Sequence, residues 1–543
     1  MNRKRLVMVT YLLLVVFVLA ACGSGANTTN STSTAVTTAV ATPEPTPEPP
    51  AEITLFFSSQ GTTYQEFDFS TNWFMDKICE MANVKFTDVI TPPAADLATK
   101  FNMLVASGTL PDLMVCPLGI AEIDKYGKDG AFLPTDSYIE KSEIVSKVYN
   151  SAQREYIKAD DGKTYAIWGY PSNADFDSDK GFAYRADLLE KLSIQTPTTY
   201  SGWIDAMRIV KEKVPDSIPF SCVGFSQYYH FMFSPYNIGF IGGMPIVWDD
   251  KTKTYTEAFG TENMVKALTN AKMLYDEGLL DKEFMTHTKN DYTNKIYSRN
   301  MLIIPKNRGG INNFISRFPT NGVADAKVLP AYYMAADGIE MTDGVYKHFG
   351  NLVGFPMTIS STTKSADACV RVIETLLSDE VKDLTVYGRE GIEYKVVDGV
   401  KTAIEPAATD AGWRLAYGVM FGINTPERMD YNAFAIIDSN PITDDAKKAY
   451  KNEFAERMKK LEETIFIDAP RADSYCEALS DELATKRSES RELQFSIVAK
   501  VIMGDMTIDE YRTEAAKIVA NDVPIVEAMN KLVADAVAKY GLK

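Results

Sequence analysis

The sequence predicts an α/β fold whose first part is built around a parallel sheet. Short apolar runs typical of strands alternate with amphipathic helical stretches in units of roughly 30 residues, the spacing of β-α-β crossovers. The chain has 543 residues, of which 45% are hydrophobic and 24% are charged, the composition of an ordinary globular protein. Without an N-terminal export segment about 490 residues remain, enough for two or three domains.

The first residues predict export and a lipid anchor. A basic start at 2–5 precedes an apolar run over 6–21. As a helix this run rises ~24 Å, short of the ~30 Å hydrocarbon core, so residues 1–21 are interpreted as a signal peptide. The run ends in Leu19-Ala20-Ala21-Cys22-Gly23, which resembles the bacterial lipobox. That resemblance implies cleavage before Cys22 and a diacylglycerol on its thiol; an ordinary cut near Ala21 is the alternative.

Residues 22–51 predict a tether between the anchor and the folded part. They are rich in Gly, Ser, Thr and Asn and then in Pro and Glu, with no hydrophobic periodicity. The first half is expected to be flexible and the proline-rich half extended.

The folded part begins with strands and helices in strict alternation. The patterns predict strands at 53–57, 85–90 and 113–116, with helices over 72–81 and 94–106, the second ended by Ser107-Gly108. Later short strands are expected at 166–168, 246–248, 301–304 and 328–329. The C-terminal part is helix-rich, with helices expected over 366–377, 444–463, 473–503, 509–519 and 525–540.

The charge balance excludes two classes of partner. Loss of the three basic residues of the signal takes the net charge from −17 to −20. Phosphate backbones and anionic lipid surfaces both require basic footprints. We therefore expect no nucleic-acid partner, and contact with the membrane through the lipid anchor only.

No compact catalytic or metal-binding motif is present. The three histidines are isolated, and no nucleophile-elbow, zincin or P-loop pattern occurs, so neither an enzyme nor a cofactor or metal site is predicted. Carboxylates at Asp175, Asp177 and Asp179 could suit Ca²⁺, but Lys180 stands where a calcium loop needs glycine, which favours a solvated loop. The five cysteines after Cys22 are widely spaced, which favours buried thiols over disulfides.

Aromatic residues gather where loops are expected. Tyr, Phe and Trp make up 11% of the chain, and the run over 228–240 shows no clean strand or helix period and ends near glycines. Aromatic faces stack on the C–H faces of sugar rings, whereas core packing is the alternative for any single ring. A loop lining a cleft is therefore expected at 228–240.

Four segments carry a family resemblance by their order and spacing. The segment 161–167 is followed directly by Trp168, at a position where proline is common. The segments are Asn102-Met103-Leu104-Val105-Ala106-Ser107-Gly108-Thr109-Leu110-Pro111-Asp112, Asp161-Gly162-Lys163-Thr164-Tyr165-Ala166-Ile167, Ala183-Tyr184-Arg185-Ala186-Asp187-Leu188-Leu189 and Tyr387-Gly388-Arg389-Glu390-Gly391-Ile392-Glu393-Tyr394.

Together these segments resemble extracellular solute-binding protein family 1, in its large Gram-positive lipoprotein form. The resemblance implies a periplasmic-binding-protein fold, with two α/β lobes joined by a hinge that the chain crosses more than once. Lobe one is expected to use 52–166 and 301–358, and lobe two 167–300 and 359–543, with crossings near 168–184, 298–306 and 356–364. It also implies a monomer at the outer face of the cell membrane that captures an oligosaccharide for ABC permease subunits. A hydrolase or a sensor input domain that reuses the fold is the alternative.

Seven side chains are predicted to contact the ligand. Aromatic residues from both lobes and the hinge form the expected sugar platform, and Arg185 is a candidate partner for hydroxyls or an acidic sugar, with a structural salt bridge as its alternative. Trp203 and Trp248 are assigned to the core instead. The predicted ligand-binding residues are Trp73, Trp168, Tyr170, Arg185, Tyr229, Phe233 and Trp413.

Overall fold

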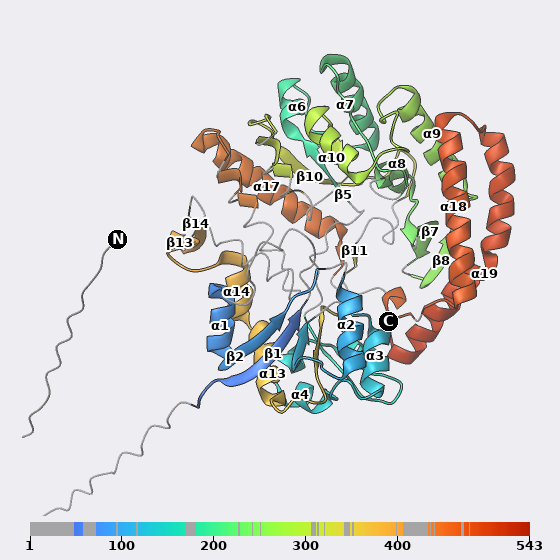
Figure 1. The fold of residues 1–543 in the computed structure, drawn as a ribbon. Coiled ribbons are helices and arrows are strands. Elements are labelled where there is room, and N and C mark those ends of the chain that lie inside the picture. Colours follow the sequence, from blue (N-terminus) through green and yellow to red (C-terminus); the bar gives the residue numbers. More distant parts are fainter. Residues whose placement is uncertain are drawn as a thin grey trace, which may run out of the picture. The chain divides into compact units, whose positions relative to one another are not determined.

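The computed structural model describes residues 48–542 apart from short gaps (Figure 1). It separates residues Met1–Pro49 from a compact unit, Pro50–Lys543, to which all that follows refers. The gaps fall at 58–71, 94–95, 116–117, 170–180, 226–228, 242, 250, 306–310, 312–313, 316, 320, 341–347, 350–351, 398, 405–432, 435, 439, 468–471 and 477.

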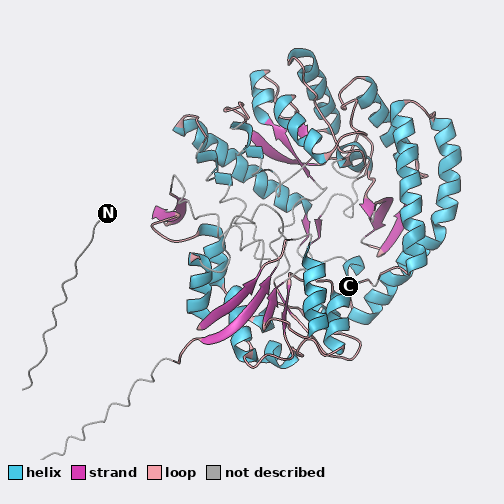
Figure 2. Ribbon diagram, in the orientation of Figure 1, coloured by secondary structure: helices cyan, strands magenta, loops and turns pink. Residues whose placement is uncertain are grey.

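The first lobe is built on a five-stranded sheet in the order β2-β1-β3-β12-β4. The first three strands, β2 (Val84–Ile90), β1 (Ala51–Phe57) and β3 (Leu113–Val115), are parallel, as predicted. The later strands β12 (Pro356–Ile359) and β4 (Ile167–Trp168) join by antiparallel pairing. Helices flank these strands (Figure 2). The apolar residues of strands and helices form one buried core.

Caps fix the ends of the helices that follow β1 and β2. The Asn72 side chain accepts the N–H groups of Phe74 and Met75, at 3.1 and 3.0 Å, and begins α1 (Trp73–Ala82). Helix α2 (Leu97–Ser107) ends at Gly108, whose φ of 67° lies in the left-handed region that glycine adopts without strain. Both predicted helices are confirmed. The remaining helices of this lobe are α3 (Ile120–Lys128), α4 (Asp136–Lys141), α5 (Ser151–Tyr156), α13 (Ala366–Leu376) and α14 (Asp379–Tyr387).

The second lobe has an antiparallel sheet in the order β10-β5-β9. Its strands are β10 (Val328–Tyr332), β5 (Gly181–Arg185) and β9 (Ile303–Ile304), and parallel bridges from Phe220 to Ile303 and Leu280 extend it. A second sheet consists of β6 (Phe240–Ile241), β7 (Met244–Asp249) and β8 (Thr254–Glu257). The helices are α6 (Ala186–Lys191), α7 (Tyr200–Lys213), α8 (His230–Phe233), α9 (Glu262–Asp276), α10 (Lys289–Ser298), α17 (Asp444–Ile465), α18 (Asp481–Met503) and α19 (Ile508–Tyr540).

The lobe boundaries differ from those expected. The sequence predicts that 301–358 belongs to lobe one, but β9 and β10 pair with β5, and residues between 301 and 336 lie in the second core. Conversely, 359–381 packs in the first core through α13 and the start of α14. The crossings of the described chain therefore run from β4 to β5, from β10 to β12, and from α14 to α17. An apolar run of two to five residues does not specify its partner strand, which is why the sequence placed these segments wrongly.

Two long helices close the chain. Helices α18 and α19 contact each other along their length (Figure 1). Two helices were expected on either side of Pro524, but α19 continues through it. The burial of Ile525, Met529 and Val533 against β7 and β8 stabilises the second half in line with the first.

Other local predictions are confirmed. Trp203 and Trp248 are buried in cores, at 1% and 0% exposure. Cys222 and Cys369 are buried free thiols, whereas Cys79 and Cys476 are free thiols that are only half-buried. Cys116 lies outside the described residues. Among the described helices, none combines the length and the apolar character needed to cross a bilayer.

Candidate functional site

A cavity of about 650 Å³ opens in the second lobe, past the carboxyl end of the strand segment that contains Phe220. Ligands of α/β sheets bind at this end of the strands. Gly224 turns the chain here with φ of 52°, and its N–H donates to the carbonyl of Phe284 at 2.7 Å. The lining residues are Val223, Gly224, Phe225, Tyr229, Gly243, Met285, His287, Arg491, Glu492 and Phe495.

Three rings form an aromatic wall of this cavity. Phe225 stacks on Phe495 with ring centroids 5.3 Å apart and an interplanar angle of 24°. Tyr229 meets both rings edge-on, at 6.0 Å. The expected loop at 228–240 contains the short helix α8, whose Phe233 is fully buried, so only part of this run faces a cavity. Phe225 and Tyr229 are each only 6% exposed, so the half-buried Phe495 presents the most accessible ring of this wall for stacking.

A charged pair borders the wall. The guanidinium of Arg491 lies 2.9 Å from a carboxylate oxygen of Glu492. The stem of Arg491 crosses Gly243 so closely that a Cβ at that position would clash with it. The φ of 84° favours glycine at 243, and a larger residue there would also displace the side chain of Arg491. The pair places a fork of donors and a carboxylate acceptor beside the aromatic wall.

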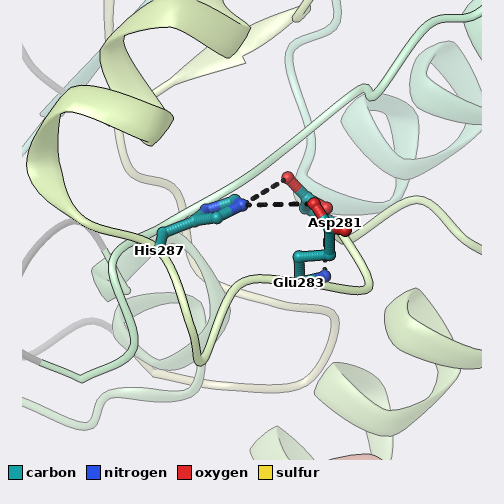
Figure 3. Close-up of side chains that lie close together, drawn as sticks. All are labelled: Asp281, Glu283 and His287. Atoms are coloured by element: carbon teal, nitrogen blue, oxygen red, sulfur yellow. Dashed lines mark hydrogen bonds and ion pairs between the residues drawn. The ribbon is translucent and has the colours of Figure 1, made fainter.

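Behind the cavity, three potential metal ligands lie together (Figure 3). His287 Nε2 is 3.3 Å from Asp281 Oδ2 and 4.0 Å from Glu283 Oε2. The ammonium of Lys295 lies 2.9 Å from Asp281, 2.6 Å from Glu283 and 2.8 Å from His287 Nε2. The ammonium of Lys295 thus already supplies the positive charge that these three potential metal ligands favour.

The same cluster resembles a hydrolase triad in composition but not in geometry. Ser221 Oγ donates to Asp281 Oδ2 at 3.1 Å and lies 3.4 Å from His287 Nδ1. In a working triad the serine proton goes to a histidine that a carboxylate orients on its other nitrogen. Here the serine is fully buried and bonds to the carboxylate itself. The arrangement stabilises the turn at 281–287 and holds no accessible nucleophile.

In the first lobe, Trp73 is half-buried at the start of α1, just after β1 along the chain. The guanidinium of Arg389 lies 4.2 Å from the centre of its ring. Arg389 in turn makes a bidentate pair with Glu393, which is 4% exposed. Trp73 therefore has a stacking partner from the segment that resembles the family, and its contact with a ligand stays a prediction.

Three of the predicted residues lie inside the cores. Trp168 is 5% exposed in β4, and Phe233 is fully buried. Arg185 is 1% exposed and forms two hydrogen bonds of 2.6 Å with Asp187 while lying over the ring of Phe318. These side chains leave little or no surface for a ligand, and Arg185 follows its alternative, the structural salt bridge. Tyr170, Trp413, Cys22 and the Asp175-Asp177-Asp179 group lie outside the described residues.

Of the predicted residues that the structure describes, Tyr229 alone lines the cavity of the second lobe. Sequence reasoning missed Phe225, His287, Arg491 and Phe495. Phe225 follows a glycine next to the aromatic run and could have been included with it. Phe495 and Arg491 belong to a helix some 270 positions away, and no local pattern connects them to that run.

Comparison with known proteins agrees with this architecture. The family model described as bacterial extracellular solute-binding protein matches residues 80–383, more than half of the chain. The chain belongs to this family. Proteins of the extracellular solute-binding family bind solutes and are not enzymes.

Individual relatives within the solute-binding family are distant. The polygalacturonan/rhamnogalacturonan-binding protein YtcQ of Bacillus subtilis is 21% identical over 440 residues, covering 79% of this chain and 82% of its own. A human-milk-oligosaccharide (HMO)-binding, ABC-transporter-associated protein of Bifidobacterium longum infantis has a TM-score of 0.63 at 14% identity, covering 90% and 99%. The Streptococcus pneumoniae protein FusA in complex with kestose gives 0.58 at 16%, also covering 90% and 99%. These structures share the fold.

Proposed function

We propose that this chain is a lipid-anchored binding protein that captures an oligosaccharide between its two lobes and delivers it to the permease subunits of an ABC transporter. It acts as a monomer at the outer face of the cell membrane and is held there by Cys22. The observation that carries the proposal is the cavity of the second lobe, in which an aromatic wall stands beside Arg491 and Glu492. Rings bind the apolar faces of sugars, and the charged pair binds hydroxyls.

The relatives support a carbohydrate. YtcQ is named for two pectic polysaccharides, FusA for fructooligosaccharides, and a further S. pneumoniae relative is named a carbohydrate ABC transporter substrate-binding protein. Trp73 is the aromatic ring that we propose the first lobe contributes to the ligand. Closure of the lobes would bring contacts that only the liganded state makes.

The hydrolase alternative is disfavoured by chemistry. Ser221, His287 and Asp281 form the one such grouping that we identify in the described part of the chain, and its serine is buried and bonded to the carboxylate. We therefore propose that the protein binds its sugar without cleaving it. Turnover of an oligosaccharide by the purified protein would overturn this.

The test is a thermal-unfolding screen of the mature protein. The panel consists of oligogalacturonides, fructooligosaccharides and milk oligosaccharides, with peptides as the counter-class. A ligand at 100 times its Kd adds about 2.7 kcal/mol to the free energy of unfolding. Stabilisation by a glycan is the expected result. A shift with peptides and with none of the glycans would contradict the proposal.

A pair of variants on α18 locates the site. Phe495→Ala removes one ring of the wall and should weaken binding of the identified glycan by ~1–3 kcal/mol, the range for stacking on aromatic side chains. Leu493→Ala, two residues away and 51% exposed, should leave the affinity unchanged. Equal affinities for the two variants would place the sugar elsewhere.

A further inference from the structure

A second cavity, of about 760 Å³, lies between the first lobe and the C-terminal arm, the segment formed by η5 (Ala472–Tyr475) and the end of α19. It shares no residue with the cavity of the second lobe. Its volume falls within the ~300–1,000 Å³ typical of small-molecule sites. The lining residues are Ile120, Ala121, Asp124, Glu155, Tyr156, Lys158, Ala159, Asp160, Gly162, Tyr475, Cys476, Ala478, Lys539 and Tyr540.

One wall of this cavity is a cluster of three tyrosines. The centroids of Tyr156, Tyr475 and Tyr540 lie 5.4–5.9 Å from one another. The cluster packs on Leu352, whose carbonyl accepts a 2.6 Å hydrogen bond from the side chain of Gln153. Leu352 belongs to the connection between β10 and β12, which crosses between the lobes. The tyrosine wall therefore joins the first lobe, a crossing segment and the C-terminal arm.

A carboxylate oxygen on the opposite side lacks a hydrogen bond. Asp124 Oδ1 is buried and has no donor among the described residues. Loss of hydration raises the pKa of this carboxyl most strongly; the charge of Lys128 lowers it, and the charges of Asp160 and Asp161 raise it. The other acids at the cavity have cations, since Lys158 lies 2.8 Å from Glu155 and Lys128 lies 2.8 Å from Asp160. The carboxylate of Asp124 is therefore an acceptor at the cavity that a hydroxyl group of a ligand would satisfy.

We propose that this cavity is a second binding site, which takes one or two rings of a neutral sugar. The tyrosine wall supplies apolar ring faces, and Asp124 accepts a hydroxyl proton that nothing in the described protein provides. Lys158 and Lys539 also line the space, but the charge of Asp124 disfavours an acidic sugar at the point where the hydroxyl is accepted. A sugar bound here bridges the first lobe and the arm, so it biases the lobes toward one arrangement while the transported ligand occupies a different cavity.

The test uses the thiol of Cys476, a half-buried residue that lines the cavity. The alkylation rate of Cys476 is measured by mass spectrometry in the mature protein, with Cys79 as an internal reference. The probes are lactose, maltose, cellobiose and sucrose, with digalacturonic acid as the charged control. A disaccharide at about ten times its Kd should slow alkylation of Cys476 roughly tenfold, because the empty site declines as 1 + [L]/Kd.

Two variants decide whether the protection comes from this cavity. Asp124→Leu keeps a similar shape and removes both acceptor oxygens, and Ala121→Phe fills the space from an exposed position; both should abolish protection while the protein stays folded. Phe495→Ala, in the other cavity, should preserve it. The proposal fails if none of the four neutral disaccharides protects Cys476, if digalacturonic acid protects equally, or if protection survives both cavity variants or is lost in Phe495→Ala. These outcomes are independent of transport-ligand binding.

Discussion

At the scale of single residues, a buried ion pair stabilises the interior of the second lobe. Arg185 and Asp187 pair in a bidentate geometry inside the second lobe, and Asp187 also accepts the N–H of Lys327 at 3.1 Å. Arg185 Nη1 is buried and has no hydrogen-bond partner among the described residues, so the ion pair and the ring of Phe318 compensate the burial of this charge only in part. Arg185 in the Tyr-Arg-x-Asp segment thus forms the structural salt bridge that was the alternative to ligand contact.

Glu257 is a buried carboxyl that makes stability depend on pH. Desolvation at the end of β8 raises its pKa from the ordinary 4.5 to about 7, and the charge of Asp522 adds to this. The folded state therefore holds the proton more tightly than the unfolded state, so stability is highest below pH 4.5 as far as Glu257 is concerned and declines as pH rises from 4.5 to 7.

Glu257→Gln should flatten this decline. At pH 8 the variant should be more stable than the natural protein by roughly 1–3 kcal/mol, because it buries no charge. Urea unfolding at pH 5 and pH 8 measures both slopes. Asp249→Asn, in neighbouring β7, is the control: its pKa is lowered by hydrogen bonds from 251 and 252, so it titrates below this window. The same slope in both variants would argue against a raised Glu257 pKa.

At the scale of elements, α19 shows how packing overrides a local break. Pro524 lacks an N–H to donate within the helix, which costs ~3 kcal/mol in a helix interior. On the next turns, Ile525, Met529 and Val533 bury against the second sheet of lobe two. In addition, Asp522 accepts hydrogen bonds of 2.8 Å from Ser490 and Gln494 of α18. These contacts keep one helix where the sequence pattern predicts two.

Pro524→Ala should therefore stabilise the protein. Residue 524 is exposed, so the change loses no packing and restores a backbone donor. We expect a gain of ~1–3 kcal/mol in the free energy of unfolding. Val523→Ala, exposed at the neighbouring position, should change little. Thermal unfolding with calorimetry compares the two; destabilisation by Pro524→Ala would mean that a bend at proline is needed to dock the arm.

At the scale of the whole molecule, the lipid anchor that we propose at Cys22 predicts capture at the outer face of the membrane. Cys22→Ser removes the thiol that would carry the lipid and should release the protein into the medium or leave it unprocessed in the membrane. Metabolic labelling with a radioactive fatty acid and cell fractionation measure this. A lipid label that persists on the variant would contradict the assignment of Cys22, and Cys79→Ser serves as the control with normal labelling.

The sequence by itself determined the local structure and the family. Strict alternation predicts β1 to β3 with α1 and α2 between them, because period-2 and period-3.6 apolar patterns and caps such as Asn72 and Gly108 act over a few residues. The order and spacing of four segments resemble those of the solute-binding family and predict its fold. The one predicted aromatic that lines the second-lobe cavity, Tyr229, came from a run dense in rings, a signal that is also local.

Tertiary structure alone decided which distant segments meet. The sequence predicts β9 and β10 in the other lobe, but both strands pair with β5. Backbone hydrogen bonds between strands do not depend on residue type, so the sequence pattern does not identify the partner strand. Phe495 completes a wall begun by Phe225, and the tyrosines of the C-terminal arm meet Tyr156 of the first lobe. The side chains of Arg185, Phe233 and Trp168 are buried in the cores. The exposure of a side chain depends on everything packed around it and not on its neighbours in the chain, so the sequence pattern does not predict it.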